Sequence, residues 1–396
     1  MSSTYSLLAN WNYPTQIRIG AGRLKELPES CAALGITSPL LVTDPGLVQF
    51  PMIHQAIKIC KDADLRVNLF SQIKANPIEQ NVRDGIDAYH TGKHDGVIAM
   101  GGGSALDAAK AIALMIGQQK RPIWDFEDVG DNWKRVNVTG MAPVIAIPTT
   151  AGTGSEVGRA SVITDPVRQL KTIIFHPNMM PKIVILDPEV TRELPPALTA
   201  ATGMDALAHN LEAYCSPFYH PMAEGIALEG IRLVKDNLLR VVQDGEDLEA
   251  RCQMLVASSM GATAFQRGLG AMHALAHPLG ALYDAHHGRL NAILMPYVLM
   301  ANRPAIDSKI ERLAAYLSIN NGFDGFLNWL LTLRKNLAIE HSLSQLGVWV
   351  EQPSHIAKMA TEDAAAGGNP IAFSRLQYEQ ILMAAIEGDL NQAIIN

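Results

Sequence analysis

Residues 96–114 read GVIAMGGGSALDAAKAIAL, an apolar run of strand-forming residues followed by three glycines, a serine and a strongly helical segment. Glycines at such a junction let the backbone approach a ligand closely. The helix start at Ser104 offers free N–H groups and a positive dipole end, which suits a pyrophosphate. The segment has neither the Gly-Lys-Ser/Thr of a Walker loop nor G-x-G-x-x-G spacing. By itself it therefore fits a dinucleotide-binding loop and a plain strand-to-helix turn equally well.

The sequence on both sides of this stretch alternates between strand and helix patterns up to about Pro188. Strands are predicted for six β-branched or apolar runs, at residues 16–20, 39–44, 65–70, 96–100, 144–148 and 182–188. Helical patterns lie near residues 22–35, 46–62, 79–92 and 104–117. Such alternation is typical of a largely parallel sheet that is covered by helices on both faces. The sequence thus predicts an α/β domain over residues 1–190.

Beyond residue 190 the strand patterns nearly disappear, and segments rich in Ala, Leu, Met and Glu with a 3.6-residue period take their place. Breaking residues divide this region into eight to ten expected helices, which predicts an all-helical domain over residues 191–396. A chain of 396 residues is too long for one ordinary compact core, so two domains are expected. The cleft between two such domains is the usual place for a ligand.

Composition and charge exclude several classes of function. The net charge is −7 and the pI is near 5.9, so binding to nucleic acid or to an anionic membrane is not expected. The four cysteines are isolated, which argues against a disulfide framework or a thiolate zinc site and fits a reducing cytoplasm. We see no secretory signal, and the most apolar stretch, near residues 96–117, is too short to cross a bilayer. A cytoplasmic protein without nucleic-acid or membrane partners is expected.

A second turn and one carboxylate strengthen the interpretation of the glycine stretch as a dinucleotide-binding loop. Residues 147–157, IPTTAGTGSEV, follow another predicted strand and bring hydroxyls and glycines together, which again suits an anion. Asp44 closes a further strand, where a carboxylate can accept both ribose hydroxyls of an adenosine and repel a 2′-phosphate. This arrangement favours NAD over NADP. Asp44 precedes the glycine stretch, however, whereas the acid of the usual dinucleotide fingerprint follows it, and an Asp here also fits a simple turn before Pro45.

Carboxylate and imidazole side chains recur at helical spacing in the second half of the chain. Asp205 and His209 are four residues apart and so lie on one helical face. Four more histidines lie within sixteen residues: His273, His277, His286 and His287. One carboxylate with two or three imidazoles and no thiol suits Fe(II) or Zn(II). The chain contains no H-E-x-x-H, so a zincin-type protease is not indicated.

Four segments in this order resemble the iron-containing (group III) alcohol dehydrogenases: GGGSALDAAK, PTTAGTGSEV, TGMDALAHNLEAY and GLGAMHALAHPLGALYDAHHG. The resemblance extends from about Ile17 to the NP-containing segment near Asn369. It implies a dehydroquinate synthase-like architecture, with an N-terminal dinucleotide-binding domain and a helical C-terminal domain. It also implies an NAD(H)-dependent reaction between an alcohol and an aldehyde or ketone, and a homodimer or higher homo-oligomer.

The resemblance also implies roles for individual residues. The metal ligands of the family fall on Asp205, His209, His273 and His287. His277 matches a histidine near the nicotinamide and the metal. His286 is a neighbour of these residues and has the weakest claim of the four histidines to a role in the site. The cofactor contacts fall on Asp44, Asn76, Gly102, Gly103, Ser104, Thr149, Thr150, Thr153, Val162 and Lys171. Phe265 matches an aromatic position that lines the substrate channel.

Arg267 is the feature of the substrate region that departs from the family pattern, together with Gln266. Both are bulkier and more polar than the residues common at these positions. One interpretation is that Arg267 points to solvent or pairs with a surface acid. The other is that it biases the pocket toward an anionic or polar aldehyde.

The mechanism implied is hydride transfer between a metal-bound alkoxide and NAD, with the metal as Lewis acid and His277 as the proton relay. Fe²⁺ is the expected metal and Zn²⁺ the alternative. Two other enzyme classes compete with this interpretation. One is a glycerol-dehydrogenase- or dehydroquinate-synthase-like relative of the same fold, and the other is a metal-dependent hydrolase whose glycine loop binds a phosphorylated substrate. A non-enzymatic metal-binding protein would leave both phosphate-suited loops without a purpose.

Overall fold

The computed structural model describes residues 9–11, 15–118, 121–168 and 170–395. The chain divides into two compact units, of which the first ends at Leu194 and the second begins at Pro195. The division expected from the sequence, after residue 190, lies close to this point.

The first unit is built on a seven-stranded sheet with the order β1-β2-β9-β6-β5-β3-β4. All neighbouring strands run parallel except β1 and β2, which pair antiparallel. The strands are β1 (Ala9–Trp11), β2 (Gln16–Ile19), β3 (Pro39–Val42), β4 (Asn68–Phe70), β5 (Gly96–Gly101), β6 (Val144–Pro148) and β9 (Ile183–Leu186). The largely parallel sheet is thereby confirmed, and each of the six predicted runs contains one of its strands. The short edge strand β1 was not predicted.

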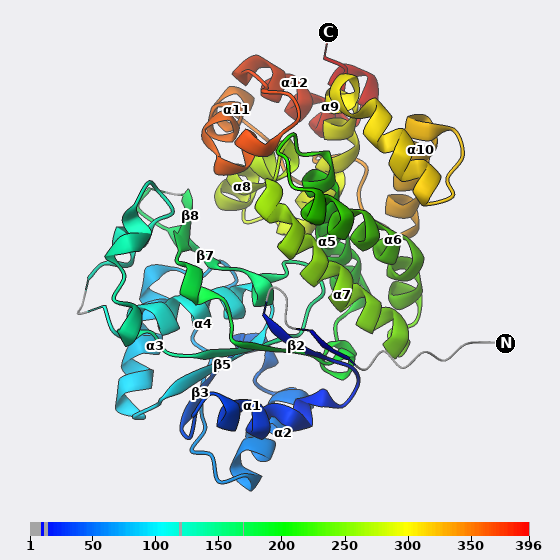
Figure 1. Cartoon of the computed structure of the whole chain (residues 1–396). Helices are drawn as coiled ribbons and strands as arrows, with labels where there is room; N and C mark the ends of the chain where they lie inside the picture. The colour runs from blue at the N-terminus through cyan, green and yellow to red at the C-terminus, as the bar shows by residue number, and fades with distance from the viewer. Residues whose placement is uncertain (1–8, 12–14, 119–120, 169, 396) are drawn as a thin grey trace, which may run out of the picture. The chain divides into compact units, whose positions relative to one another are not determined.

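Helices cover both faces of this sheet (Figure 1). They are α1 (Leu27–Ala33), α2 (Pro51–Asp62), α3 (Glu79–Thr91) and α4 (Gly103–Met115). The strand β5 is buried along its whole length because it lies inside the sheet and is covered from both sides. Its alternate residues Ile98 and Met100 pack in one core with residues of α1 and α2, whereas α4 packs on the opposite face. This double covering explains why the central strands are continuous apolar runs.

A two-stranded antiparallel sheet in the first unit was not predicted. It is formed by β7 (Ala160–Asp165) and β8 (Leu170–Phe175), with Val162 opposite Ile173 and Thr164 opposite Lys171. Buried and half-buried residues alternate along β7, the pattern of a strand with one covered face. Two of the three covered residues, Ser161 and Asp165, are polar, so the sequence ASVITD lacks the apolar alternation that would have indicated this strand.

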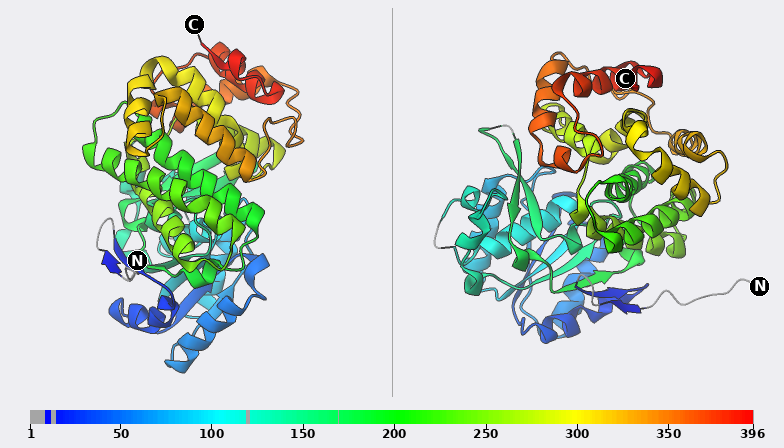
Figure 2. Two further views of the ribbon diagram at one scale, coloured as in Figure 1. Left: turned by 90° about the vertical axis from the view of Figure 1, so that its right-hand side faces the viewer. Right: turned by 45° about the horizontal axis from the view of Figure 1, so that its top comes forward.

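The second unit contains eight α-helices and no strand within its described residues, 195–395. The helices are α5 (Pro196–Cys215), α6 (Pro221–Gln243), α7 (Leu248–Ala264), α8 (Ala271–Tyr283), α9 (His287–Tyr316), α10 (Gly322–Asn336), α11 (Pro353–Glu362) and α12 (Arg375–Glu387). The helix α5 is buried along nearly its whole length and packs against α6, α7 and α9. Figures 1 and 2 show α11 and α12 side by side, and α11 also packs on α8. The helical second half is as predicted.

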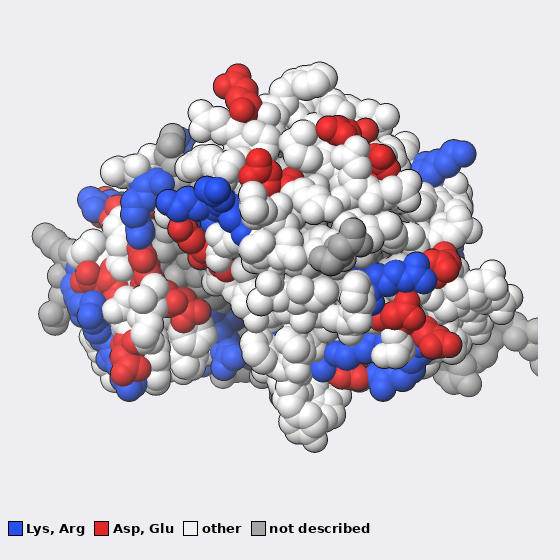
Figure 3. Space-filling model, turned by 90° about the horizontal axis from the view of Figure 1, so that it is seen from above, with Lys and Arg blue, Asp and Glu red and all other residues white. Residues whose placement is uncertain are grey.

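Charged side chains of both signs lie beside one another at several places on the face shown in Figure 3. Exposed ion pairs of the second unit include those of Arg303 with Asp307 and Asp324. None of the described helices is both long and apolar enough to cross a membrane.

Candidate metal centre and cofactor loops

Three potential metal ligands of the second unit converge, although they come from three different helices. Asp205 lies on α5, His273 on α8 and His287 at the first residue of α9, and one ligand atom from each lies within 4.8 Å of the others. Gly288 permits this convergence, because a Cβ atom there would lie 2.3 Å from the carbonyl oxygen of Ala201 on α5. The glycine thus lets the start of α9 touch α5 and brings His287 beside Asp205.

The centre of this group is a buried carboxylate between imidazoles. Asp205 and His273 are almost fully buried, and His287 is half-buried. The Oδ1 atom of Asp205 lies 3.6 Å from Nε2 of His287 and 4.0 Å from Nε2 of His273. Burial alone would raise the pKa of Asp205, but the neighbouring imidazoles and a hydrogen bond from Asn291 outweigh burial and hold it well below its usual range. Asp205 therefore offers an anionic oxygen to a cation.

The side chain of Asn291 tests whether this group fits a metal ion. Its Nδ2 atom lies 2.8 Å from Oδ1 of Asp205, 3.1 Å from Nε2 of His273 and 3.2 Å from Nε2 of His287. An amide nitrogen has two hydrogens, so it cannot give each of three acceptors a hydrogen bond of its own. Its Oδ1 atom is buried and has no hydrogen-bond partner among the described residues. Three lone pairs thus converge on one point, and a divalent cation fits the donor set.

His209 lies beside this group. It follows Asp205 by one turn of α5, is buried, and its ring stacks on that of His273 with 4.7 Å between centroids and 16° between planes. It also contributes to lowering the pKa of Asp205. The compact group of ligand atoms consists of Asp205, His273 and His287, so the structure places the fourth predicted ligand next to the other three but not within the same 4.8 Å.

The remaining two histidines of the cluster differ in their surroundings. The ring of His277 stacks on that of His287, with centroids 5.5 Å apart, and its Nδ1 atom lies 2.9 Å from Oδ2 of Asp363. His286 is exposed and precedes α9. The structure therefore places His277 at the candidate metal centre and His286 outside the group of ligand atoms.

Glu212 is a member of the site to which sequence reasoning gave no role. It lies on α5 three residues after His209, and its Oε2 atom lies 2.6 Å from Nδ1 of His273. Burial lowers the pKa of His273, but the Glu212 carboxylate outweighs burial and raises it, so Nε2 becomes more basic toward a proton or a cation. In the sequence, only the helical spacing from His209 could have indicated that Glu212 belongs to the site. No sequence pattern indicated Asn291 or Asp363.

The glycine loop and Asp44 meet at the carboxyl end of the sheet in the first unit. Asp44 follows β3 and Gly102 follows β5, and the backbone N–H of Gly102 donates to Oδ2 of Asp44 at 2.8 Å. The chain leaves β3 toward β4 and leaves β5 toward β6, on the other side, so this is the topological switch point where open sheets bind ligands. Burial raises the pKa of Asp44 against the opposing hydrogen bond from Gly102. Asp44 is half-buried.

The second predicted turn packs directly on the glycine loop. A Cβ atom at Gly103 would lie 2.6 Å from Cγ2 of Thr153, and Thr150 lies 3.7 Å from such an atom at Gly102. The backbone N–H of Thr149 donates to the carbonyl of Gly101 at 2.9 Å. A side chain at position 103 would therefore collide with Thr153, because the two loops touch there. The structure brings these predicted cofactor residues together.

Helix α4 fixes the segment that follows the second turn. The carboxylate of Asp107 accepts hydrogen bonds from Oγ of Ser155 at 2.5 Å and from the backbone N–H of Val162 at 2.9 Å. The buried Lys110 donates to the carbonyls of Ser155 and Ala160. Val162 is therefore tied to α4, which also carries the glycine loop at its start.

The other predicted cofactor residues lie at different points around the loop. The hydroxyl of Ser104 donates to the carbonyl of Ala75, which is next to the half-buried Asn76. This contact ties residues 75–76 to the glycine loop and engages the hydroxyl of Ser104. Lys171 lies on β8, opposite Thr164.

The two predicted substrate residues have different environments. The ring centroid of Phe265 lies 5.2 Å from that of His209, at the candidate metal centre. Arg267 is buried, so the expectation that it points to solvent is wrong. It pairs with Glu224 at 2.8 Å and donates to the carbonyls of three residues at the end of α5 and just after it: Ala213, Tyr214 and Phe218. These contacts account for its guanidinium without a substrate.

Comparison with known proteins identifies the family. Residues 14–188 match the family described as iron-containing alcohol dehydrogenase, and residues 199–386 match the C-terminal domain of the same family. The chain belongs to the iron-containing alcohol dehydrogenase family. This membership confirms the resemblance seen in the sequence and makes the protein a dehydrogenase-type oxidoreductase.

Individual members of this family align with nearly the whole chain. A 4-hydroxybutyrate dehydrogenase from Cupriavidus necator is 37% identical over 380 residues, which cover 93% of this chain and 98% of the relative. A solved 1,3-propanediol oxidoreductase superposes with a TM-score of 0.88 at 32% identity and covers 93% of this chain and 98% of its own. Sulfoacetaldehyde reductase from Bifidobacterium kashiwanohense, solved with NAD⁺, has a TM-score of 0.85 at 26% identity and covers 96% and 99%.

Proposed function

We propose that this protein is a metal- and NAD(H)-dependent alcohol dehydrogenase, or in reverse an aldehyde reductase, with its cation bound by Asp205, His209, His273 and His287. The observation that carries the proposal is the convergence of three ligand atoms on one amide hydrogen-bond donor that cannot satisfy them all. Fe²⁺ is the cation proposed, after the family, and Zn²⁺ suits the same ligands.

The bound cation would supply Lewis acidity for the alcohol oxygen, and bound NAD⁺ would accept the hydride. The protein supplies the rest. His277 receives the alcohol proton at Nε2, because its Nδ1 atom is held by Asp363 at 2.9 Å. Phe265 presents an apolar ring next to His209 and would line the substrate channel.

The cofactor is proposed to lie along the glycine loop. The start of α4 at Gly103 offers its backbone N–H groups and its positive dipole end to the pyrophosphate. Ser104 would bind the cofactor through its backbone N–H group, because its hydroxyl already donates to the carbonyl of Ala75. Thr149, Thr150 and Thr153 line the opposite turn, Asp44 and Asn76 take the adenosine side, and Val162 and Lys171 take the nicotinamide side. The Asp44 carboxylate favours NAD over NADP.

The substrate class proposed is a small alcohol or aldehyde. The three relatives are named for 4-hydroxybutyrate, 1,3-propanediol and sulfoacetaldehyde, which are all small molecules with a second polar group. A homodimer or higher homo-oligomer is proposed as the working form, as in the sequence analysis. No disulfide joins the four buried cysteines, which fits the reducing cytoplasm as its location.

The test is metal analysis of the purified protein together with NADH formation over a panel of short alcohols, diols and hydroxy acids. We expect bound Fe²⁺ or Zn²⁺ and NAD reduction that a chelator abolishes and added metal restores. Asp205→Asn should lose both, whereas Asp307→Asn, at an exposed carboxyl on α9, should lose neither. Absence of metal-dependent NADH formation with every alcohol would contradict the proposal and favour the hydrolase alternative.

A further inference from the structure

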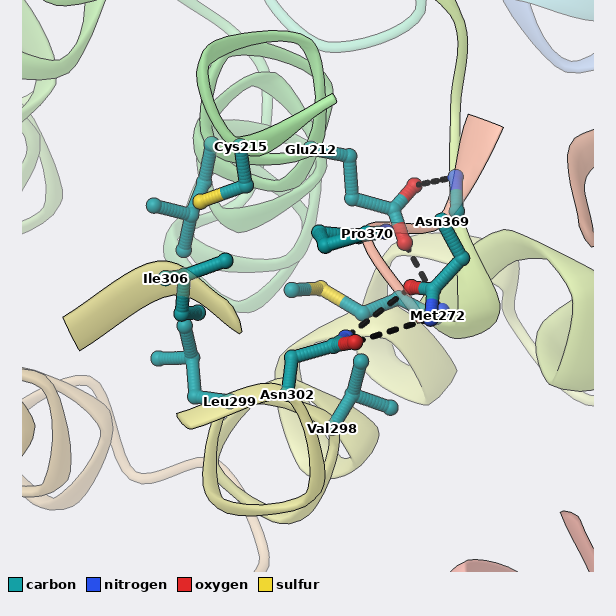
Figure 4. A pocket seen from close by; sticks show the side chains of 11 residues that line it. Glu212, Cys215, Met272, Val298, Leu299, Asn302, Ile306, Asn369 and Pro370 are labelled. Carbon is teal, nitrogen blue, oxygen red and sulfur yellow. Dashed lines mark hydrogen bonds between the residues drawn. The ribbon is translucent and has the colours of Figure 1, made fainter. Parts of the chain in front are cut away.

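The carboxylate of Glu212 receives three hydrogen bonds in the interior of the second unit. Its Oε1 atom accepts from the backbone N–H of Met272 at 2.7 Å, and its Oε2 atom accepts from the backbone N–H of Gly270 at 2.8 Å. The third contact joins Oε2 to Nδ1 of His273 at 2.6 Å. The Glu212 side chain is 4% exposed. Figure 4 shows the carboxylate directed at the segment that begins α8.

Two of these hydrogen bonds cap helix α8 from another element. Gly270 is the N-cap residue and has no side chain that could accept from the free N–H groups of the first turn. Glu212 accepts from two of these groups, and Oδ1 of Asn369 accepts from the third, on Ala271, at 3.1 Å. A Cβ atom at position 270 would lie 2.9 Å from Asn369 and 3.0 Å from Glu212, so glycine is required there. A negative charge is also favourable at a helix N-terminus.

The third hydrogen bond fixes the proton on His273. An ionised carboxylate only accepts, so Nδ1 must carry the hydrogen. In the neutral ring Nε2 then has a bare lone pair. The contact on the other side of the ring agrees, because the amide nitrogen of Asn291 is a donor and lies 3.1 Å from Nε2. A hydrogen on Nε2 would place two donors face to face.

We propose that Glu212 is a positioning residue that selects the Nδ1–H tautomer of His273 and so presents Nε2 as a metal ligand before any cation binds. Because the same carboxylate caps α8, the ring orientation is fixed relative to the helix that carries it. Partners of this kind orient metal-ligating histidines and increase their basicity. The role of Nε2 as a ligand rests on the proposed function, whereas the choice of tautomer does not.

Glu212→Gln is the informative substitution because it keeps the shape of the side chain. The glutamine amide carries an NH₂ group, which would face a hydrogen-bond donor whether it took the place of Oε1 or of Oε2. At the Oε1 position it would oppose the N–H of Met272. At the Oε2 position it would oppose the N–H of Gly270 and donate to His273, which moves the imidazole hydrogen to Nε2. Each placement opposes one backbone N–H, so the cap favours neither of them, and a mixture of the two His273 tautomers is expected.

Asn369→Ala is the matched control. It removes the cap of Ala271 on the same helix terminus, but Asn369 does not contact His273 and bonds instead to Ala271, Asn302 and Ile371. Figure 4 shows Asn302 and Asn369 paired beside a cavity of ≈ 10 Å³, which has room for about one water molecule. Loss of cap stability alone should affect both variants, whereas only Glu212→Gln should affect the imidazole.

The experiment measures the tautomer and the metal separately on the full chain. In metal-free protein labelled with ¹⁵N-histidine, the resonance that disappears in His273→Gln should report an Nδ1–H ring in the wild type and in Asn369→Ala. In Glu212→Gln it should report Nε2–H or a mixture. Zn²⁺ affinity, from chelator competition, should fall about 10- to 100-fold in Glu212→Gln and stay within about threefold of wild type in Asn369→Ala.

The outcomes separate this inference from the proposed function. A wild type that binds no Zn²⁺ would contradict the metal centre, while the tautomer in metal-free protein would still decide the role of Glu212. An Nε2–H ring in the wild type, or unchanged tautomer and affinity in Glu212→Gln, would overturn the inference. If Glu212→Gln does not fold, Glu212→Asp takes its place. It keeps the charge, so it should retain the Nδ1–H tautomer and lose less Zn²⁺ affinity than a neutral residue.

Discussion

The Nδ1 atom of His277 and the Oδ2 atom of Asp363 lie 2.9 Å apart, so a carboxylate from beyond the end of α11 orients an imidazole of α8. The other oxygen of Asp363 accepts from the backbone N–H of Ala365 at 2.8 Å, which holds the carboxylate in place. His273 has the same kind of partner in Glu212. Two imidazoles of one helix are thus each fixed through Nδ1, with Nε2 left for chemistry.

The first prediction concerns His277 as proton relay. His277→Ala should lower kcat by about 100-fold, the lower range for the loss of a general acid–base group. Metal content should stay near that of the wild type, because the convergent ligand atoms come from other residues. Steady-state kinetics and metal analysis of the same preparation check this. Loss of metal in the variant would instead make His277 a ligand.

The second prediction concerns Asp363, which acts through His277. Asp363→Asn should lower kcat by about 10- to 100-fold, because the imidazole loses the partner that fixes its orientation. The double variant with His277→Ala should be no slower than His277→Ala alone, since both changes affect one proton path. Measuring kcat for both single variants and the double variant tests this. Independent, multiplying losses would show that Asp363 acts elsewhere.

The third prediction assigns Arg267 to stability. Arg267→Ala leaves Glu224 without one partner and removes a donor from three carbonyls, of which, among the described residues, only that of Tyr214 keeps another, from Lys309, so unfolding should become easier by about 3 kcal/mol. Chemical denaturation measures this loss. The ratio of turnover with neutral and acidic aldehydes should not change, because the guanidinium is already bound by the protein. A shift of that ratio would revive the hypothesis that Arg267 selects an anionic substrate.

The fourth prediction is a pH dependence from Glu224. Burial raises the pKa of Glu224, but Arg312, Arg267 and Lys309 outweigh burial and lower it. A folded pKa below the unfolded one stabilises the protein above the unfolded pKa, and the contribution disappears as pH falls through the folded value. The difference in unfolding free energy between wild type and Glu224→Gln should therefore be largest at neutral pH and shrink below about pH 4. A difference that grows on acidification would contradict it. Glu362→Gln, at an exposed site, should change stability by less than about 0.5 kcal/mol throughout.

The fifth prediction concerns cofactor choice at Asp44. Asp44→Ser removes the carboxylate that would oppose a 2′-phosphate, and like charges in contact cost several kcal/mol. The preference for NAD over NADP, as a ratio of kcat/KM values, should fall at least about tenfold, or roughly 1.4 kcal/mol. Ser keeps an oxygen that can accept from Gly102, which limits damage to the glycine loop. An unchanged ratio would place the 2′ position away from Asp44.

The fold could be predicted from sequence because its signals are local. Apolar runs such as GVIAM are buried on both faces of a parallel sheet, and a strand covered from both sides must be apolar throughout. The hairpin of β7 and β8 shows the limit of this approach. Its strands are half-covered and lie between two loops, so their alternation was weaker than the runs around it.

The sequence by itself determined the α/β alternation, the helical second half, the glycine loop and the residues that match the family's metal ligands. Only the tertiary structure decided which imidazoles converge with Asp205 and what holds each one. The decisive partners are distant in sequence, 61 residues between Glu212 and His273 and 86 between His277 and Asp363. Helical spacing tells which residues share a face, but the packing of helices decides what that face meets.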